Sequence, residues 1–284
     1  MAIQYGLVAD DQTQAFLPLV PDSTVRNLLD DQEILVAGAV KDGKAAGIMI
    51  FRKDAFSVDI QYLAVAQDCR RQGIATGMIN FLCKIAWNTG KALLCSFMAE
   101  NWDDPICRLL TKRGDFTMNE TGDYICRFPC GELKDVRLGA QDAECNIEFF
   151  YKLPEHVQNS FIAHMKEDNY EFVRGLNEDK DTMLESLCLC VEEKGVVNAA
   201  LFCHSQDGDV VLSFLYSKPG HVRSLMALIC RLREMLVKVS HKLNYLRIAA
   251  VTPESRKLVE TILPGREIVG KFYLACWDMN TMGD

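Results

Sequence analysis

The sequence predicts an α/β fold built from two similar copies in tandem. Three observations predict it. The chain has 284 residues, enough for about two domains. Strand-like and helix-like patterns alternate along it. The order of these patterns in the first half returns in the second. We therefore expect one domain at residues 1–131 and another at 132–284.

The first half contains a complete set of strand and helix patterns. We predict first a strand at 2–9, two short helices within 12–30 broken at Pro18 and Pro21, and a hairpin around Asp42-Gly43. A long strand at 57–65 and a helix at 76–89 follow. The buried strand LLCSFM, a helix at 105–113 and two closing strands, near Phe116 and at 124–128, complete the set. The Asp-Gly pair is a hairpin signal because both residues tolerate positive φ. The segment Phe128-Pro129-Cys130-Gly131 is a natural end for this copy.

The second half repeats this order with different residues. We predict, in turn, the strand NIEFFYKL, the helix PEHVQNSFIAHMKE, a hairpin turning at Lys194-Gly195, the long strand DVVLSFLYS, the helix HVRSLMALICRLREMLVKVS, the strand LRIAAV, the helix PESRKLVETIL, and the segments EIVGK and FYLACWDM. Because the order is kept while the residues differ, we expect the two copies to have different tasks.

Composition narrows the class of protein. The 31 Lys and Arg are outnumbered by 39 Asp and Glu, giving a formal charge of −8. This balance argues against a nucleic-acid or anionic-membrane partner, since neutralising phosphates requires a basic face. Apolar runs stay short of the ~20 residues that a membrane span needs. The N-terminal MAIQYGLVADDQ lacks the charged and apolar regions of a signal peptide. We expect a cytoplasmic protein.

The twelve cysteines predict buried, reduced thiols rather than a metal site. Their spacing is irregular and contains no CxxC pair, and all five histidines lie in the second half of the chain. Zinc sites usually need closer groupings of Cys and His. We therefore expect no metal, and keep a metal or redox protein only as a third alternative.

The loop after the long strand of the first copy carries the clearest chemical signal. Arg70-Arg71-Gln72-Gly73-Ile74-Ala75-Thr76 follows a strand directly and opens a helix. Main-chain N–H groups in that setting can turn toward an anion, and the helix N-terminus adds partial positive charge. Gly73 and Ala75 are small enough to let phosphate oxygens approach the backbone. A plain strand-to-helix turn is the competing interpretation.

Residues 60–116, IQYLAVAQDCRRQGIATGMINFLCKIAWNTGKALLCSFMAENWDDPICRLLTKRGDF, resemble the core of the GNAT acetyltransferase superfamily. The resemblance covers the long strand, a pyrophosphate loop of the R/Q-x-x-G-x-G/A type, its helix, the next strand up to Asn101, and the helix closing at Gly114. It implies two tandem GNAT-like domains, each a mixed, mostly antiparallel central sheet flanked by helices.

The resemblance also implies an acetyl-CoA site in the first copy. The amides of the loop, with the two arginines, would hold the pyrophosphate, while the main chain of the long strand would pair with the pantetheine arm. A main-chain N–H near Val65 would polarise the acetyl carbonyl, and Asn101 would position the cofactor arm. The cofactor-binding residues expected on this basis are Leu63, Ala64, Val65, Arg70, Arg71, Gln72, Gly73, Ile74, Ala75, Thr76 and Asn101.

The sequence departs from the family pattern at the groups that move protons. Gln61 stands where members often carry a glutamate base, and Leu110 where they often carry a tyrosine acid. We expect Asp59 to be the first candidate base, because side chains two apart on a strand share a face, and Glu100 the second. Tyr124 or Tyr62 would substitute for the acid. A polar strand-end role is the competing interpretation for both carboxylates.

The acidic residues and the tryptophan expected near this site each have two interpretations. The acidic residues that fall where the family places its substrate-facing helices would either attract a cationic amine or form a solvated surface; they are Asp10, Asp11, Asp22, Asp30, Asp31 and Glu33. Trp102 would line the acceptor pocket or serve packing. In the second copy, Ser217 to Ser224 replaces the phosphate loop, and Pro219 removes a main-chain donor. We expect that copy to be degenerate, without tight CoA binding.

The resulting hypothesis is an N-acetyltransferase that moves an acetyl group from acetyl-CoA to a primary amine by direct attack. The acceptor would be a small molecule or a peptide: aminoglycosides, polyamines, amino acids and protein N-termini remain open. The alternative is a non-catalytic acyl-CoA-binding or interaction protein that retains the fold. The second copy would form a wall of the acceptor site or a homodimer contact.

Overall fold

The computed structural model describes residues 3–21, 25, 26, 28–138, 145–167 and 182–279. The chain forms two compact units: Met1–Gly122 with Lys271–Asp284, and Asp123–Gly270. Each contains a mixed sheet with helices, which confirms the predicted fold class. The units do not divide at residues 131 and 132, because the last strand of the chain packs with the first unit.

The first unit is a mostly antiparallel sheet covered by two α-helices. Its elements are β1 (Gln4–Leu7), β2 (Ile34–Lys41), β3 (Lys44–Lys53), β4 (Ser57–Val65), α2 (Ile74–Thr89), β5 (Ala92–Ala99), α3 (Pro105–Arg113), the first part of β6 (Phe116–Pro129) and the last part of β12 (Glu267–Trp277). The strand order is β1-β2-β3-β4-β5-β12-β6. Only β4 and β5 are paired in parallel among the pairs described. Helix α2 packs on this sheet through Ile74, Met78 and Leu82.

The second unit has the same plan. Its elements are the second part of β6, β7 (Ile147–Phe149), α4 (Glu155–Glu167), β8 (Leu189–Glu193), β9 (Val196–Gln206), β10 (Asp209–Ser217), α6 (Val222–Val239), β11 (Tyr245–Ala250), α7 (Pro253–Ile262) and the first part of β12. The strand order is β12-β6-β11-β10-β9-β8-β7, again with one parallel pair, β10 with β11. The main apolar core lies among β9, β10, β11, α6 and α7.

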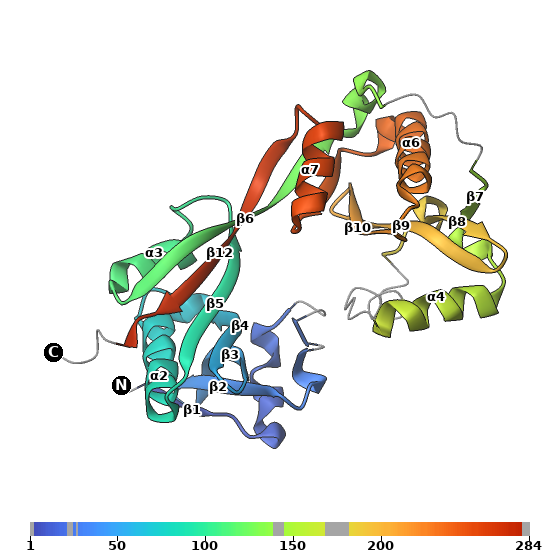
Figure 1. The fold of residues 1–284 in the computed structure, drawn as a ribbon. Helices are drawn as coiled ribbons and strands as arrows, with labels where there is room; N and C mark the ends of the chain where they lie inside the picture. Colours follow the sequence, from blue (N-terminus) through green and yellow to red (C-terminus); the bar gives the residue numbers. More distant parts are fainter. Residues whose placement is uncertain (1–2, 22–24, 27, 139–144, 168–181, 280–284) are drawn as a thin grey trace. The chain divides into compact units, whose positions relative to one another are not determined.

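The two units exchange their closing strands. In the first, β5 pairs not with β6 but with β12, over Lys271–Cys276. In the second, β11 pairs with β6, over Tyr124–Pro129. Strands β6 and β12 are neighbours, as Figure 1 shows. Each sheet is therefore completed by a strand from the other half of the sequence.

The predicted hairpins are confirmed by the backbone of their turns. Asp42 and Gly43 have φ of 53° and 76°, and Lys194 and Gly195 have φ of 55° and 80°. Two positive φ values in succession are typical of the type I′ turn, which matches the twist of the strands it joins.

Two local predictions are wrong. In place of the first of the two α-helices expected in 12–30, Asp10–Ala15 and Leu17–Leu19 form 3₁₀ turns, the second of them at Pro18. In the second, Val25 and Arg26 are α-helical and residues 22–24 and 27 lie outside the described residues, so that helix stays a prediction. The two closing strands of the first half are one strand, β6, and the segments EIVGK and FYLACWDM are one strand, β12. Gly122 has φ of 86°, yet β6 runs through it from Phe116 to Pro129.

The cysteines of the described chain are single thiols. All twelve are free, and eight of them are buried. Within the described residues there is no group of His, Cys, Asp and Glu suited to hold a metal ion. The same part of the chain contains no helix long and apolar enough to cross a membrane.

Candidate acyl-CoA site

Strands β4 and β5 separate partway along their length. Their parallel pairing runs from Ser57 with Ala92 to Ile60 with Cys95, and ends there. On its other side, β4 pairs with β3, but the register shifts between Ile60 and Tyr62, so Gln61 forms a β-bulge. A bulge bends its strand and disrupts the ladder. Gln61 therefore stands at the point where β4 turns away from β5.

A cavity of about 210 Å³ lies where the two strands diverge. It is lined from β4 by Ile60 to Leu63, from β5 by Cys95 to Phe97, and from the helices by Ile79, Ile106 and Leu110. Leu110 is fully buried. Burial raises the pKa of the Cys95 thiol to about 12, so this sulfur is protonated at neutral pH and is not a thiolate nucleophile.

The unpaired edge of β4 beyond the bulge presents main-chain groups. Ala66 donates its N–H to Ala46 of β3 at 3.0 Å. Because backbone groups alternate along a strand, the N–H of Val65 faces the opposite, open edge. The Val65 carbonyl faces the same edge, where it accepts a hydrogen bond from Arg70 Nε at 3.2 Å. The open edge at Leu63–Val65 can therefore pair with an extended ligand.

The loop between β4 and α2 has the backbone of an anion site. Arg71 and Gly73 have φ of 60° and 80°, on either side of Gln72. Residues with positive φ beside ordinary ones turn successive N–H groups to one side, forming a concavity that binds anions. Helix α2 begins at Ile74 with Gly73 as its N-cap, and no side-chain cap is present among the described residues. The first N–H groups of the helix therefore point into the same space.

The structure adds a cation that the sequence did not indicate. Lys41, at the end of β2, donates from Nζ to Gln72 Oε1 at 2.7 Å. Arg70 and Arg71 are exposed, and so is Gln72, to which Lys41 donates. The positive charges of Lys41, Arg70 and Arg71 therefore share one surface with the N-terminus of α2. No local pattern marks Lys41, because only the pairing of β2 with β3 and β4 brings it to the loop.

Gly77 and Gly47 place helix α2 against the sheet. A Cβ at Gly77 would collide with the Tyr5 side chain of β1. A Cβ at Gly47 of β3 would lie 2.8 Å from Met78 Sδ of the helix. A larger residue at either position would therefore force these side chains or the helix to shift. These contacts hold the helix N-terminus beside the end of β4.

Asp59 lies next to the cavity rather than in its lining. It precedes the last paired residue, Ile60, and accepts a hydrogen bond from Ser57 Oγ at Oδ2, 2.9 Å away. Its Oδ1 is buried and has no partner in the described part of the chain. Burial, with a smaller contribution from nearby Asp54, raises the pKa of this carboxyl.

The bulge changes which side chains share a face with Asp59. Before it, Val58 and Ile60 belong to the core under α2; after it, Leu63 and Val65 do. Tyr62 faces the other side, where its hydroxyl donates to the Leu19 carbonyl at 3.0 Å. Alternation is therefore broken between Ile60 and Tyr62, and the expectation that Asp59 and Gln61 share a face stays a prediction.

The other predicted site residues are placed apart from one another. Glu100 is exposed directly after β5. Asn101 opens the turn into α3, where its Oδ1 accepts from the Asp103 N–H at 2.8 Å. Tyr124 belongs to the second unit and is buried in its core, with the Arg266 guanidinium over its ring.

Two of the acidic residues expected to face a substrate lie beside the Arg52 guanidinium. Asp31 forms an ion pair with Arg52 at 2.6 Å, and Glu33 lies 3.9 Å from the same guanidinium. Asp10 and Asp11 are exposed, and Asp22 lies outside the described residues. Trp102 is 53% exposed and meets the Tyr273 ring edge-on, with ring centres 5.0 Å apart.

One stability prediction follows from the environment of Asp59. Because its pKa is raised in the folded state, the native protein binds this proton more tightly than the unfolded chain does. Stability therefore falls as the pH rises through the two pKa values. We expect Asp59→Asn to raise the melting temperature at pH 7, with the gain vanishing below about pH 4, the ordinary range of an Asp carboxyl. Calorimetric melting from pH 3 to 8 measures this; an Asp59→Asn protein less stable at pH 7 would contradict it.

The comparisons with known proteins agree with this geometry. Residues 6–114 match the model of the acetyltransferase (GNAT) family. No curated protein matches the chain. A tandem GNAT protein from the clavulanic acid biosynthesis pathway is similar in structure, with a TM-score of 0.58 and 11% identity, over 97% of this chain and 98% of that one. A GCN5-related N-acetyltransferase from Sphaerobacter thermophilus has a TM-score of 0.55 and 12% identity, over 96% and 95% of the two chains.

A third structure, a probable N-acyltransferase from Enterococcus faecalis, has a TM-score of 0.55 and 10% identity, over 97% of this chain and 72% of that one. At such identities the structures establish the fold. The family match falls on the stretch that carries the bulge, the diverging strands and the loop. Residues 6–114 thus match the GNAT-family model, and the whole chain has the fold of tandem GNAT proteins.

Proposed function

We propose that the first unit is an N-acetyltransferase that transfers the acetyl group of acetyl-CoA to a primary amine. The observation that carries the proposal is the divergence of β4 from β5 at the Gln61 bulge, with the anion loop at the end of the same strand. The open edge, the cavity and the anion loop thus follow one another along β4 and the turn after it. An extended thioester with a pyrophosphate at its far end suits all three.

Acetyl-CoA would be held by main-chain groups and by charge. The amides from Gln72 to Thr76, with Arg70, Arg71 and Lys41 nearby, would bind the pyrophosphate. The main chain of Leu63 to Val65 would pair with the pantetheine arm. The N–H of Val65 faces the open edge and would donate to the thioester oxygen as negative charge develops there, an effect of about 3 kcal/mol in other acyl-transfer enzymes.

The reaction requires one proton to leave the acceptor. A neutral amine nitrogen attacks the thioester carbon, the new C–N bond forms, and the C–S bond breaks to release the CoA thiolate. The ammonium proton then passes to a base, and the thiolate takes a proton from solvent. Asp59 is the first candidate base, acting directly or through water, because its pKa is raised toward neutral pH, which makes the carboxylate a stronger base. Glu100 is the second.

Asp59→Asn tests the assignment of the base. We expect turnover to fall at least about tenfold, in the lower part of the range for a lost general base, while acetyl-CoA affinity stays within twofold. The acid limb of the pH–rate profile should also disappear. Ser57→Ala is the matched control, because it removes only the hydrogen bond to Asp59 and should shift that limb upward. Unchanged turnover in Asp59→Asn would transfer the role to Glu100, tested as Glu100→Gln.

The alternative is a non-catalytic acyl-CoA-binding protein, and two lining residues favour it. The Gln61 amide at the bulge cannot act as a base toward the amine, and the buried Leu110 has no acidic group that could protonate the leaving sulfur. Both functions predict acetyl-CoA binding, so only turnover separates them. Calorimetry should give one acetyl-CoA per chain. A panel of amines, with released thiol as the readout, then decides: thiol release with an amine supports the enzyme, and binding without release supports the alternative.

A further inference from the structure

The second unit contains a cavity at the place that matches the acyl cavity of the first. Strands β10 and β11 pair in parallel from Val210 with Leu246 to Leu212 with Ile248, and the pairing ends there. The register of β10 with β9 shifts between Leu212 and Phe214, so Ser213 forms the bulge. A cavity of about 280 Å³ opens beyond this point, bounded by α6 and α7.

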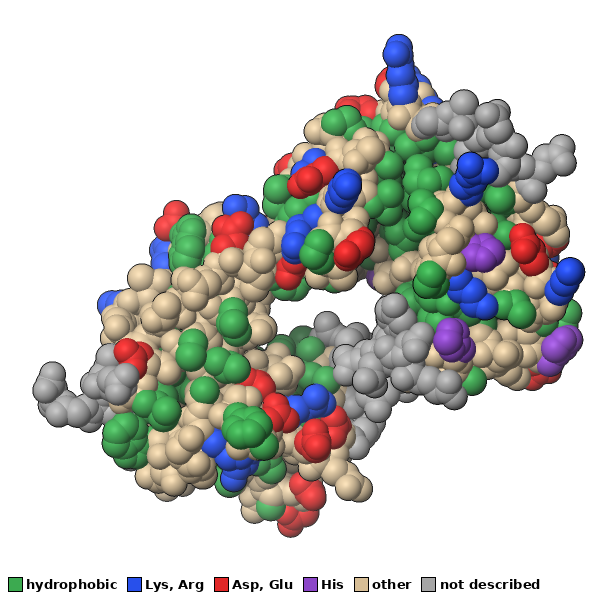
Figure 2. Space-filling view, viewed as in Figure 1, with side chains coloured by type: hydrophobic (Ala, Val, Ile, Leu, Met, Phe, Trp, Pro, Cys, Tyr) green, Lys and Arg blue, Asp and Glu red, His purple; other side chains and the backbone are tan. Residues whose placement is uncertain are grey.

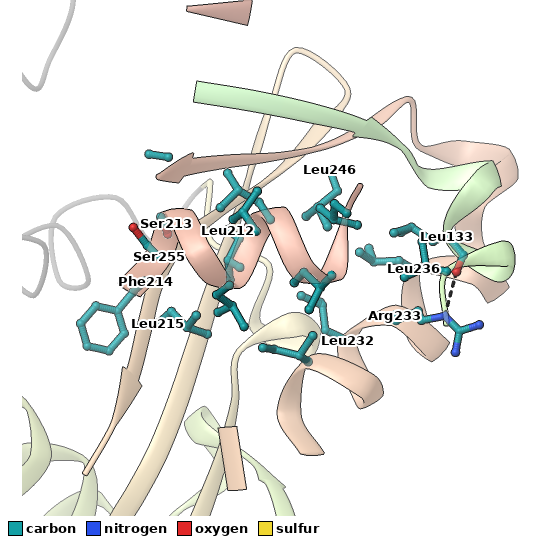
Figure 3. A pocket seen from close by; sticks show the side chains of 18 of the residues that line it. Leu133, Leu212, Ser213, Phe214, Leu215, Leu232, Arg233, Leu236, Leu246 and Ser255 are labelled. Atoms are coloured by element: carbon teal, nitrogen blue, oxygen red, sulfur yellow. Dashed lines mark hydrogen bonds between the residues drawn. The ribbon is translucent and has the colours of Figure 1, made fainter. Parts of the chain in front are cut away.

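The lining of this cavity is mostly aliphatic. By position relative to the last paired residues, Ser213 corresponds to Gln61, and Ala249 to Ser96. Most of the remaining wall is made of leucine, isoleucine and valine side chains, among them Leu212, Leu215, Leu232, Leu236, Leu246 and Ile248 (Figure 3).

The polar side chains that line the cavity are already engaged. Ser213 Oγ donates to the Phe202 carbonyl at 3.3 Å. Thr252 and Ser255 bind each other in the capping box at the start of α7. Arg233 donates from Nε to the Leu133 carbonyl at 2.7 Å, drawn dashed in Figure 3, and from Nη2 to the Lys134 carbonyl at 2.8 Å. The interior therefore offers mainly hydrocarbon surface, while Arg233, which has five N–H groups, uses two of them in these bonds.

The shape of the cavity suits a chain better than a ring. Its lining on α7 runs from Ser255 to Leu263, about 12 Å at the rise of a helix. In Figure 3, Ser213 and Ser255 lie at one end, with Arg233 and Leu133 at the other. Apolar side chains also reach the surface between α6 and α7 in Figure 2. A dry cavity of about 150 Å³ is enough to bind benzene, and this one is larger and open to the surface.

The segment between β10 and α6 has four residues, 218–221, where eight residues, 66–73, join β4 to α2. Lys218 donates its N–H to the Asn198 carbonyl at 2.8 Å, and His221 donates to the Lys218 carbonyl at 3.0 Å. Pro219, between them, has no N–H. Three of the four residues from 218 to 221 therefore offer no main-chain donor to an anion.

We propose that the second unit binds the aliphatic chain of a fatty carboxylate, held by its hydrocarbon and not by a coenzyme. Arg233 is the one charged side chain of the cavity lining, and it lies at one end, where the carboxylate would face solvent. Burial of each methylene removes apolar surface from water, so affinity depends on chain length. This site is separate from the proposed acetyl-CoA site and does not depend on it.

Calorimetric titration of the full chain with hexanoate, octanoate and decanoate tests the proposal. Each added methylene should tighten binding about fourfold until the cavity is full. Decylammonium should bind less tightly than decanoate, because Arg233 repels it. Affinity that does not change from six to ten carbons would overturn the proposal, and so would the absence of decanoate binding.

A pair of matched variants locates the site. Ala249 is exposed on β11 and lines the cavity of the second unit, as Ser96 is exposed on β5 and lines that of the first. Ala249→Trp should weaken decanoate binding at least twentyfold, and Ser96→Trp should leave it within twofold. Ala249→Leu, a smaller obstruction, repeats the test if the tryptophan variant does not melt cooperatively. Equal loss in the Ala249 and Ser96 variants would overturn the assignment.

Comparing decanoyl-CoA with decanoate tests whether the coenzyme adds to the affinity of the aliphatic chain. In a protein that carries both Ser96→Trp and Gly73→Val, where the cavity and the anion loop of the first unit are both disabled, decanoyl-CoA should bind the second unit no more than threefold tighter than decanoate. A gain of tenfold or more would show that the loop at Lys218–His221 contributes to CoA binding, and would overturn the proposal.

Discussion

A chain that ends at Gly270 should lose the fold of its first unit. The missing residues include the part of β12 that pairs with β5 and buries Tyr273, Ala275 and Trp277, each at most 2% exposed. Burying a large apolar side chain contributes about 1.5–3 kcal/mol. Two aromatic side chains and a strand's hydrogen bonds together therefore approach the 5–15 kcal/mol by which a domain is stable. Acetyl-CoA binding should disappear with the fold.

Hydrogen exchange read by mass spectrometry distinguishes the units. In the shortened chain, protection should be lost over β3, β4 and α2, while β9 and β10 stay protected. A chain ending at Met279 is the control, since it keeps all of β12. Protection of β4 in the chain ending at Gly270 would contradict the prediction.

Tyr273→Ala gives the same information without shortening the chain. Tyr273 is 1% exposed and stacks on Phe97, with ring centres 5.6 Å apart. Removing a buried aromatic ring typically costs about 3–5 kcal/mol. All three tryptophans, Trp87, Trp102 and Trp277, lie in the first unit, so tryptophan fluorescence during urea unfolding reports on that unit alone. An unchanged midpoint would contradict the role of β12.

Gly73→Val should abolish acetyl-CoA binding while the protein stays folded. Gly73 has φ of 80°, which a β-branched residue adopts only at a cost, and no atom lies within 4 Å of an added Cβ. The loop must change its backbone, and its N–H groups then leave the anion site. Loss of two hydrogen bonds to a charged group, at about 1.5 kcal/mol each, amounts to about a hundredfold in affinity.

Gly43→Val is the matched control for that experiment. Gly43 has φ of 76° and also has no atom within 4 Å of an added Cβ, but it lies in the β2–β3 hairpin turn. Both variants should lose similar stability in thermal melts, and only Gly73→Val should lose acetyl-CoA by calorimetry. Wild-type affinity in a folded Gly73→Val protein would exclude the loop as the phosphate site.

Local sequence patterns predicted the turns and helices whose structure depends on their own and adjacent residues. The Asp42-Gly43 and Lys194-Gly195 turns depend on their own φ preferences, and the helix at Pro105–Arg113 depends on its Asp104 cap, its first-turn proline and Gly114 at its end. The sequence also placed the loop from Arg70 to Thr76 between a strand and a helix, as the structure does.

Features caused by distant partners were not predictable in this way. Nothing near Gly122 tells whether β6 continues or turns, because its strand neighbours decide that. The bulge at Gln61 is a mismatch with β3 and has no marker within β4 itself. It breaks the alternation on which the expected shared face of Asp59 and Gln61 depends. Lys41 joins the loop only through the sheet.

The exchange of closing strands also fixes an order of events during synthesis. Domains of a growing chain usually fold in the order in which they leave the ribosome. Here β5 waits for Lys271–Cys276, which are made after every other strand of its sheet. Closing so long a loop costs little additional entropy but slows folding. The first unit to be translated is therefore the last to be completed, and until then its β5 edge is exposed to chaperones and to other chains.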